Sequence, residues 1–536
     1  MKFRMSGIVD RVDAIEHDQM EVHVDSKTSP LAYERRAREW SGRSKAPAPS
    51  SYILQKVFMF RLLRPYSAVK CKRTVNARKI WRALRREMPT QSLETGQKEG
   101  LARRIGLFDA TMIVMGGIIG SGIFMNTYVV ARQVHTPFLI LGAWIAGGLI
   151  AIAGAFIYAE LATRRPEVGG QYAYIREAFH PAVAFVYGWG LLLVTQSGGM
   201  AAVAVTFARY FIELTNAQLP DALIAVVALA VLTVVNCFGV KAGSSVQSAL
   251  MIMKISAILA LVVCGMTFIV PTASVDHPRY LDRPMSWDLF TAFGAALIPV
   301  LFAYGGWQTA NFIAGEVEEP RKNLPRALLI GVAGVVTLYV AVNIVSLRVL
   351  GLDGLAATTT PATDIMRLAL GKTGAKLMAA GIAVSTFGFL SQGILTAPRV
   401  YFAMANDGLF FKSVASIHPR TQVPVMAVVL QGVFAAVIAL SGRYEQILNY
   451  VVSVDFVFFG LAATCLFKLR RNDAAHPSLS SHNVPGHPWT TVLFVIVCGL
   501  VTLNTVYGYP QNTLIGFGIL AAGIPVYFLW KRRKHE

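Results

Sequence analysis

Long apolar runs separated by short polar loops dominate the chain from residue 107 onward. A helix needs about 20 apolar residues to cross the hydrocarbon layer of a membrane, and the runs 137–161 and 246–271 reach that length. A window of about 19 residues predicts about twelve such spans. They lie at residues 107–130, 137–161, 182–211, 222–239, 246–271, 287–316, 327–350, 375–405, 423–440, 447–466, 490–507 and 514–530. This pattern predicts an all-α polytopic membrane protein.

The residues before position 101 have a different composition. They are polar and rich in arginine, and their one apolar stretch, 52–63, is too short and too charged to cross a membrane. We expect residues 1–100 to form a disordered cytoplasmic tail. Met88 opens a polar lead into the first span, so translation from Met88 and translation of the whole tail are both open interpretations. Residues 101–470 are expected to form a core of ten helices, and residues 471–536 two additional C-terminal helices and a short basic tail.

The formal net charge of +20 is explained by where the basic residues lie. Apart from the tail, they gather in alternate loops, which hold Arg164, Arg165, Lys241, Arg321, Lys322, Arg326, Lys412, Arg420, Lys468, Arg470 and Arg471. Lysine and arginine favour loops on the cytoplasmic side of a membrane, so we expect both termini in the cytoplasm and the chain in the inner or plasma membrane. A lipid bilayer is therefore the expected surrounding, and nucleic acid is not an expected partner.

The residue types that carry chemistry are sparse in the apolar part of the chain. The five cysteines have no metal-ligand spacing, and no cluster of His, Asp, Glu or Cys indicates an enzyme. No filter pattern with repeated pore helices indicates a channel. We therefore expect no enzyme activity, no cofactor and no metal. The function class that remains is a carrier of small solutes.

Glycines are concentrated in the first span, where residues 116–122 contain four of them at about mid-membrane depth. Each glycine costs a helix about 1 kcal/mol relative to alanine, so the cluster weakens the helix at that point. An unwound turn inside a membrane is tolerated where its backbone groups line a cavity or bind something. The helix that restarts at Ser121 and Gly122 would offer N–H donors and a positive dipole end to a carboxylate. The alternative is a small-residue face for close helix packing.

A second glycine interruption, Gly305 and Gly306, lies near mid-depth in the sixth span. The first and sixth spans run in opposite directions and occupy equivalent places in two five-helix halves. Paired interruptions at such places are the sequence signature of an inverted-repeat transporter. Carbonyl groups freed around Ile118 and Phe302 could accept hydrogen bonds from an ammonium, while the helix that restarts after the first break holds a carboxylate. The two breaks together suit a zwitterion.

Two charged residues lie deep inside apolar spans. At about 1.5 Å per residue, Lys254 lies about 12 Å below the cytoplasmic face, too deep to reach water easily. One interpretation is a fixed or titrating cation that replaces a metal ion, with Ser385 or Thr386 as neighbours, and the other is a buried lysine satisfied by carbonyls. Asp455 in the tenth span is either a proton site or a hydrogen-bonded packing residue.

Taken together, these residues resemble the amino acid–polyamine–organocation superfamily, in its branch similar to the L-type amino acid transporters. The resemblance covers residues 107–469. It rests on the motifs at 117–124 (GIIGSGIF), 158–161 (YAEL) with Gly169 and Gly170, Asn236 with 239–241 (GVK) and Gln247 before Lys254, 302–307 (FAYGGW), 323–325 (NLP), and 399–401 (RVY) through Asp407 and Gly408.

The resemblance implies a LeuT-like fold, in which the core helices form a five-plus-five inverted repeat with broken helices 1 and 6. The expected substrate-binding residues are Ile118, Gly120, Ser121, Gly122, Phe302, Ala303, Gly305 and Trp307. Within this set, Ile118, Ser121 and Gly122 would contact the backbone of an amino acid. Phe302 would act as a gate, and its carbonyl and that of Gly305 would accept from the ammonium. Lys254 would stand where sodium-coupled relatives hold a metal ion, and it is the expected coupling residue.

The chain differs at two places from the family that it resembles. Gln308 stands where several relatives carry a shorter asparagine, which leaves the size limit of the substrate open. The loop 212–220 lacks the cysteine that tethers a glycoprotein heavy subunit in animal relatives, so no heavy-chain partner is expected.

The expected function is secondary active transport of amino acids, with neutral L-amino acids first, by exchange or proton-coupled symport. The alternative is transport of a polyamine or another organocation. A dication would favour a carboxylate in the pocket, and the first, sixth and eighth spans offer none at mid-depth.

Overall fold

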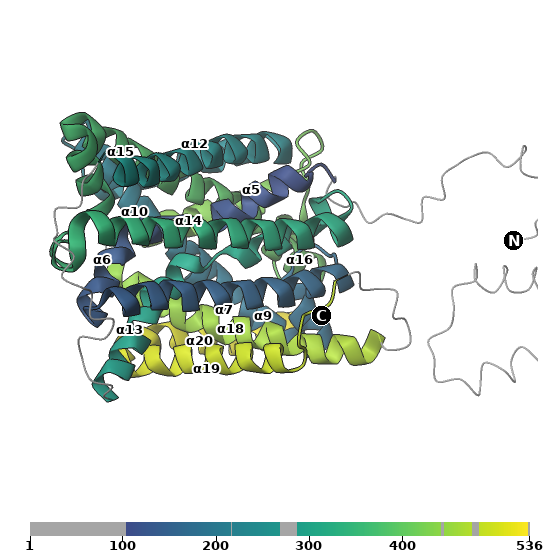
Figure 1. Cartoon of the computed structure of the whole chain (residues 1–536). Coiled ribbons are helices and arrows are strands. Elements are labelled where there is room, and N and C mark those ends of the chain that lie inside the picture. The colour runs from purple at the N-terminus through teal and green to yellow at the C-terminus, as the bar shows by residue number, and fades with distance from the viewer. Residues whose placement is uncertain (1–102, 216, 269–286, 441–443, 474–481, 534–536) are drawn as a thin grey trace, which may run out of the picture. The chain divides into compact units, whose positions relative to one another are not determined.

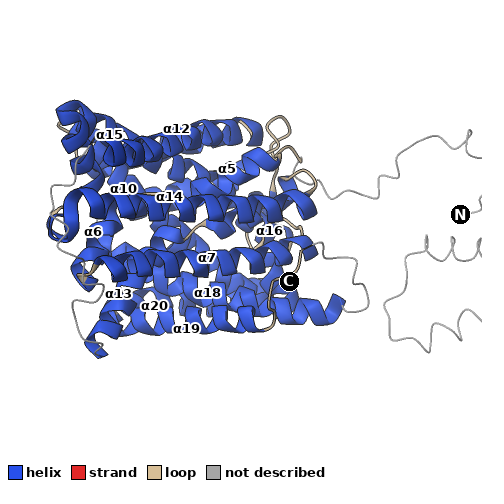
Figure 2. Cartoon of the chain, viewed as in Figure 1, coloured by secondary structure: helices blue, strands red, loops and turns tan. Residues whose placement is uncertain are grey.

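The computed structural model describes residues 103–533 except 216, 269–286, 441–443 and 474–481. The expected N-terminal tail and Met88 lie outside these residues. The described part is built from helices and contains no β-sheet (Figure 2). Its long helices run side by side along a common direction (Figure 1). A helix satisfies its backbone polar groups within itself, which a segment that crosses a membrane requires.

The helices follow the order of the apolar runs along the chain. Up to residue 267 they are α5 (Leu107–Ile118), α6 (Gly122–Val134), α7 (Pro137–Arg164), α8 (Gln171–Ala178), α9 (Pro181–Gly190), η2 (Leu191–Thr195), α10 (Gln196–Thr215), α11 (Asp221–Cys237) and α12 (Val240–Thr267). After it they are α13 (Trp287–Tyr304), η3 (Trp307–Glu316), α14 (Pro320–Ala357), α15 (Pro361–Thr396), α16 (Pro398–Asn406), η4 (Lys412–Ala415), α17 (Val425–Leu440), α18 (Tyr444–Asn472), α19 (Trp489–Gly508) and α20 (Pro510–Arg533).

Each of the twelve predicted spans falls on a helix of the structure. In the described residues, ten helical segments are long and apolar enough to cross a membrane. The other two predicted spans are α11, with 17 residues, and α17, with 16 residues, both apolar but shorter. The prediction of an all-α, multi-pass membrane protein is confirmed.

Two helices are longer than the runs that predicted them, because each continues past a glycine in a left-handed conformation. In α14 the glycine is Gly351, with a φ of 66°, and in α15 it is Gly371, with a φ of 65°. Neither position has another atom within 4 Å of where a Cβ would lie, so only the backbone conformation favours glycine there. These kinks mark where the long spans change direction.

The first span is broken, as the glycine cluster predicts. α5 ends at Ile118, residues 119–121 are not helical, and α6 begins at Gly122. The sixth span is broken at Gly305 and Gly306, where α13 gives way to the 3₁₀ helix η3 and Gly306 has a φ of 100°. α5 packs against η3, and α6 packs against α13. The two broken spans therefore lie antiparallel, with their breaks at the same level.

Candidate functional site

A cavity of about 70 Å³ lies at the two breaks. Residues on both sides of the first break line it, together with the sixth span around Phe302 and parts of η2, α10, α15 and α18. The lining residues that the sequence predicted are Ile118, Gly120, Ser121, Gly122, Phe302, Ala303 and Gly305. A membrane carrier needs a site of this kind, where non-helical backbone meets an enclosed space.

Ser121 immediately precedes α6 and lies on the cavity wall. Its side chain is 1% exposed, and its hydroxyl has no hydrogen-bond partner among the described residues. The first N–H groups of a helix have no partner inside that helix, and the dipole makes this end positive. The orphaned hydroxyl and the start of α6 together form a site with the polarity that a carboxylate requires.

Gly122 serves helix packing as well as the break. A Cβ atom at this position would lie 2.8 Å from both the Cα and the Cβ of Ala303, so no larger residue fits between α6 and α13. The glycine cluster therefore has two roles: it allows close helix packing, and it breaks the helix. Both arise from the same lack of a side chain.

The carbonyl groups at the two breaks differ in how many donors they already accept. The Ile118 carbonyl accepts the Gly120 N–H at 2.9 Å and faces the Tyr339 hydroxyl at 3.2 Å. The same hydroxyl lies 3.2 Å from the carbonyl of Ala303. The Phe302 carbonyl accepts the Gly305 N–H at 3.1 Å. Since a carbonyl oxygen has two lone pairs, Phe302 retains more acceptor capacity than Ile118 for an ammonium.

Lys254 lies in α12, fully buried, and its ammonium donates to the carbonyl of Ile119 inside the first break. It also lies against α15, because a Cβ on Gly388 would be 3.6 Å from its Nζ. Next to it, the hydroxyl of Ser385 lies 3.4 Å from the carbonyl of Gly120. Lys254 and Ser385 therefore hold the unwound segment from the side of α12 and α15. Thr386 does not take part, since its hydroxyl bonds to carbonyls of its own helix.

Lys254 does not line the cavity, although the segment it holds does. Lys254 thus lies between the first, fifth and eighth spans. No group of three His, Cys, Asp or Glu side chains that could hold a metal ion occurs in the described residues.

The remaining cavity wall comes from residues that the sequence analysis did not place in the site. They include Thr195 and Gln196 of the third span, Phe389 and Gln392 of α15, and Asp455, Phe456 and Phe459 of α18, with Gln308 and Thr309 of η3 beside them. Asp455 had a sequence signal, as an isolated charge in an apolar span, and Gln308 had one, as a longer side chain than several relatives carry. The others are ordinary residues of helices that happen to face the breaks.

Trp307 lies beside the cavity and not on its wall. Its ring packs against Tyr158, with ring centroids 4.7 Å apart, and against Phe459, with centroids 5.6 Å apart. Phe459 does line the cavity, so Trp307 acts on the site through that side chain.

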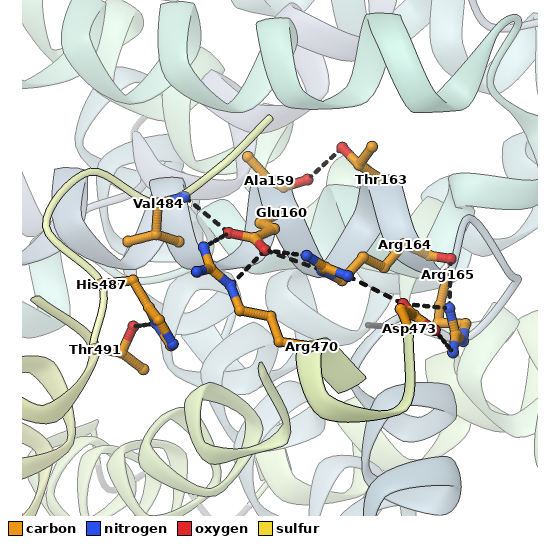
Figure 3. Close-up of polar contacts among 10 residues, drawn as sticks. All are labelled: Ala159, Glu160, Thr163, Arg164, Arg165, Arg470, Asp473, Val484, His487 and Thr491. Atoms are coloured by element: carbon orange, nitrogen blue, oxygen red, sulfur yellow. Dashed lines mark hydrogen bonds and ion pairs between the residues drawn. The ribbon is translucent and has the colours of Figure 1, made fainter. Parts of the chain in front are cut away.

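One end of the bundle, here called the basic end, holds a network of ion pairs centred on Glu160 of α7 (Figure 3). Glu160 is fully buried and accepts from Arg470 of α18 at 2.6 and 2.8 Å, from Arg164 at 2.8 Å and from the N–H of Val484 at 2.8 Å. Asp473 extends the network by binding Arg164 at 3.1 Å and Arg165 at 2.9 Å. The network therefore fastens the end of α7 to the end of α18.

Burial and the hydrogen bonds from two arginines act on the pKa of Asp473 in opposite directions. Burial acts to raise its pKa, but the hydrogen bonds from Arg165 and Arg164 outweigh burial, and the pKa lies below the ordinary value of an aspartate. Asp473 is therefore ionised at neutral pH.

A second connection at this end joins η3 to α16. Glu316 and Arg399 form a fully buried ion pair with a distance of 2.6 Å between Nε and Oε1. The backbone carbonyl of Glu316 also accepts the N–H groups of Arg104 and Ile105, just before α5. The basic ends of both broken spans are thus tied to each other and to α16.

The comparisons with known proteins agree with this architecture. A model of the amino acid permease family matches residues 105–530. The serine/threonine exchanger SteT of Bacillus subtilis is 30% identical over 451 residues, which are 82% of this chain and 99% of that protein. The human large neutral amino acids transporter small subunit 2 is 28% identical over 448 residues, 81% of this chain and 82% of that protein. The human cystine/glutamate transporter is 28% identical over 442 residues, 81% of this chain and 86% of that protein.

These relatives are carriers and not enzymes, and the match covers both broken spans and the cavity between them. The chain belongs to the amino acid permease family of membrane transporters.

Proposed function

We propose that this permease carries free amino acids, with neutral L-amino acids as its main substrates, by alternating access. The observation that carries the proposal is the cavity between the two breaks, where the start of α6 and the orphaned hydroxyl of Ser121 lie near the carbonyls at Phe302. An amino acid has a carboxylate and an ammonium a fixed distance apart, and the two breaks offer partners to each.

In the proposed complex, Ser121 and the N–H groups at Gly122 bind the carboxylate, and the Phe302 carbonyl accepts from the ammonium. The side chains of Ile118, Phe302 and Ala303 then enclose the substrate backbone, with Gly120 and Gly305 leaving room for it. Trp307 supports the wall through Phe459. These roles use only backbone groups of the substrate, so they suit the differing amino acids named for the three relatives.

A polyamine is the weaker alternative. The sequence argument against it was that the first, sixth and eighth spans supply no carboxylate, but Asp455 of α18 lines the cavity. The preference for amino acids rests instead on the anion-binding character of the Ser121 site, which a polyamine would leave unused, and on the relatives, all of which carry amino acids by name.

Lys254 is proposed to couple substrate binding to the conformational cycle. Its ammonium holds the Ile119 carbonyl within the break, so a change in this contact changes the segment that binds the carboxylate. Whether the cycle is exchange or proton symport depends on whether Lys254 keeps its proton throughout.

The basic end is proposed to face the cytoplasm, which places both termini there and the chain in the inner or plasma membrane. Arg164, Arg165 and Arg470 gather at this end (Figure 3), and the positive-inside rule supports the assignment. No heavy-chain subunit is proposed, because the loop 212–220 contains no cysteine.

Purified protein in proteoliposomes tests the proposal. Uptake of a panel of labelled amino acids and of putrescine is measured with and without unlabelled substrate inside, and with and without a pH gradient. We expect saturable uptake of neutral L-amino acids, inhibited by the unlabelled substrate. Stimulation by internal substrate indicates exchange, and stimulation by external acid indicates symport. Uptake of putrescine without uptake of any amino acid would overturn the proposal.

A further inference from the structure

One ionisable side chain, Asp455, lies among the described residues that line the cavity. The side chain is only partly buried, and the space it faces is the cavity itself. No lysine or arginine shares the lining, and the ion pairs of the described residues do not include Asp455. A carboxylate deep in the bundle thus faces the substrate space without a cation from the described residues.

The neighbours of Asp455 leave this carboxylate available. Thr195 lies beside it and also lines the cavity; its side chain is 5% exposed, and its hydroxyl is a neutral group that interacts with the Asp455 carboxylate. Tyr187 is a further polar neighbour, but its hydroxyl donates to Gln171 at 2.9 Å. Neither neighbour therefore neutralises the carboxylate with an ion pair.

The local backbone supports a functional role for this wall. Thr195 closes a π-helical turn, η2, between α9 and α10. Such turns are uncommon, are frequent at functional sites, and change the direction in which the following side chains point. Here the turn directs Thr195 and Gln196 into the cavity beside Asp455.

A carboxylate in a protein interior is costly unless a donor satisfies it. The first and sixth spans already offer groups for the backbone of an amino acid, so the remaining part of the ligand near Asp455 is its side chain. We propose that Asp455 accepts a hydrogen bond from the substrate side chain. The permease then prefers amino acids whose short side chain ends in a hydrogen-bond donor. This inference rests on the proposed function and deepens it.

The size of the cavity limits the length of that side chain. A water molecule needs roughly 10–15 Å³ of such space, and the whole cavity has about 70 Å³. Compact side chains such as those of serine, threonine, homoserine and 2,4-diaminobutyrate fit this limit. An acidic side chain would meet a like charge in a poorly solvated space and is expected to be excluded.

Pairs of nearly isosteric amino acids test the proposal in proteoliposomes. Threonine and valine differ in one hydroxyl, and homoserine and 2,4-diaminobutyrate differ in whether the donor is charged. We expect the wild-type protein to take up threonine at least tenfold better than valine and to accept 2,4-diaminobutyrate at least as well as homoserine. Uptake of aspartate is expected to be absent.

Two substitutions of Asp455 distinguish the effect of its acceptor oxygen from the effect of its negative charge. D455L keeps the branching but removes the acceptor, so the ratio of threonine to valine uptake is expected to fall close to one. D455N keeps an acceptor oxygen without charge, so threonine stays preferred, whereas 2,4-diaminobutyrate is expected to lose at least tenfold against homoserine. D288N, at the exposed start of α13, is the matched control and should leave both ratios unchanged.

The outcomes distinguish this inference from the proposed function. If the wild-type protein transports no amino acid, the proposed function fails and the inference with it. If it transports amino acids but D455L and D455N keep both wild-type ratios, the inference alone is overturned. If D455L is too unstable to transport, the homoserine and 2,4-diaminobutyrate ratio in D455N decides.

Discussion

Gly117 and Gly306 lie so close together that a Cβ atom on Gly117 would stand 2.7 Å from the carbonyl oxygen of Gly306. The contact joins the last turn of α5 to the break of the sixth span. Tyr339 strengthens the same junction, because its hydroxyl lies 3.2 Å from the carbonyls of Ile118 and Ala303, one from each broken span. The two breaks are therefore in direct contact, and Tyr339 bridges them.

Gly306→Ala is expected to abolish transport. Gly306 has a φ of 100° and also faces the Gly117 backbone, so a methyl group there adds a steric clash to backbone strain. Strain alone costs about 1–2 kcal/mol, and a clash against rigid backbone adds about 1–3 kcal/mol. Uptake at matched membrane levels measures the effect.

Gly351→Ala is the control for that substitution. Its φ of 66° with a ψ of −178° is a conformation that almost only glycine adopts, so the backbone strain is at least as large, but nothing lies within 4 Å of the added methyl group. It should keep most of the uptake. Equal losses in both variants would mean that strain, and not the contact between the breaks, is responsible.

Ser121→Ala is expected to weaken substrate affinity by about three- to tenfold, because one neutral hydrogen bond contributes about 0.5–1.5 kcal/mol. The maximal rate should change less than the KM, since the N–H groups at the start of α6 remain. Competition for uptake of a labelled substrate gives the KM. Ser346→Ala is a matched control, because Ser346 is equally buried but its hydroxyl bonds to the Val342 carbonyl of its own helix. A wild-type KM for Ser121→Ala would show that the Ser121 hydroxyl does not contribute to substrate binding.

Lys254→Met is expected to cripple net transport while the protein still inserts. Methionine keeps the length of the side chain but cannot donate to the Ile119 carbonyl, so the unwound segment loses the contact that the ammonium makes. Uptake into empty and substrate-loaded vesicles, with and without a pH gradient, measures net transport and exchange separately. Lys412→Met, at an exposed position, is the control. Superimposable behaviour of Lys254→Met and the wild-type protein would leave Lys254 as a packing residue.

Asp473→Asn is expected to lower the thermal stability at neutral pH but not in strong acid. The pKa of Asp473 is lower in the folded protein than in the unfolded chain, so its ion pairs contribute stability above the unfolded value. An unperturbed aspartate has a pKa of about 3.9. The contribution of the ion pairs to stability is lost as the pH falls below that value and through the pKa of the folded protein. Melting temperatures of both proteins in detergent between neutral and acid pH should therefore converge on acidification. A constant difference would contradict the assignment to ionised Asp473.

Much of the architecture could be predicted from local sequence. Apolar runs long enough to cross a membrane predicted the helices, and glycines that weaken a helix predicted both breaks, at residues 119–121 and at Gly305 and Gly306. Lys254 was singled out because an isolated cation is costly in an apolar span, with Ser385 or Thr386 expected as its neighbours. Each of these conclusions depends on a cost that a residue imposes on its own helix.

The other wall of the cavity was decided by tertiary structure alone. Thr195, Phe389 and Asp455 belong to three helices whose apolar patterns do not reveal which side faces the breaks, because a buried helix is apolar all round. The π-helical turn that directs Thr195 into the cavity left no sequence signal. Sequence by itself therefore determined where the first and sixth spans are broken, since backbone conformation is a local property. The packing of distant helices decided which side chains line the rest of the cavity, because that depends on the rotation of each helix within the bundle.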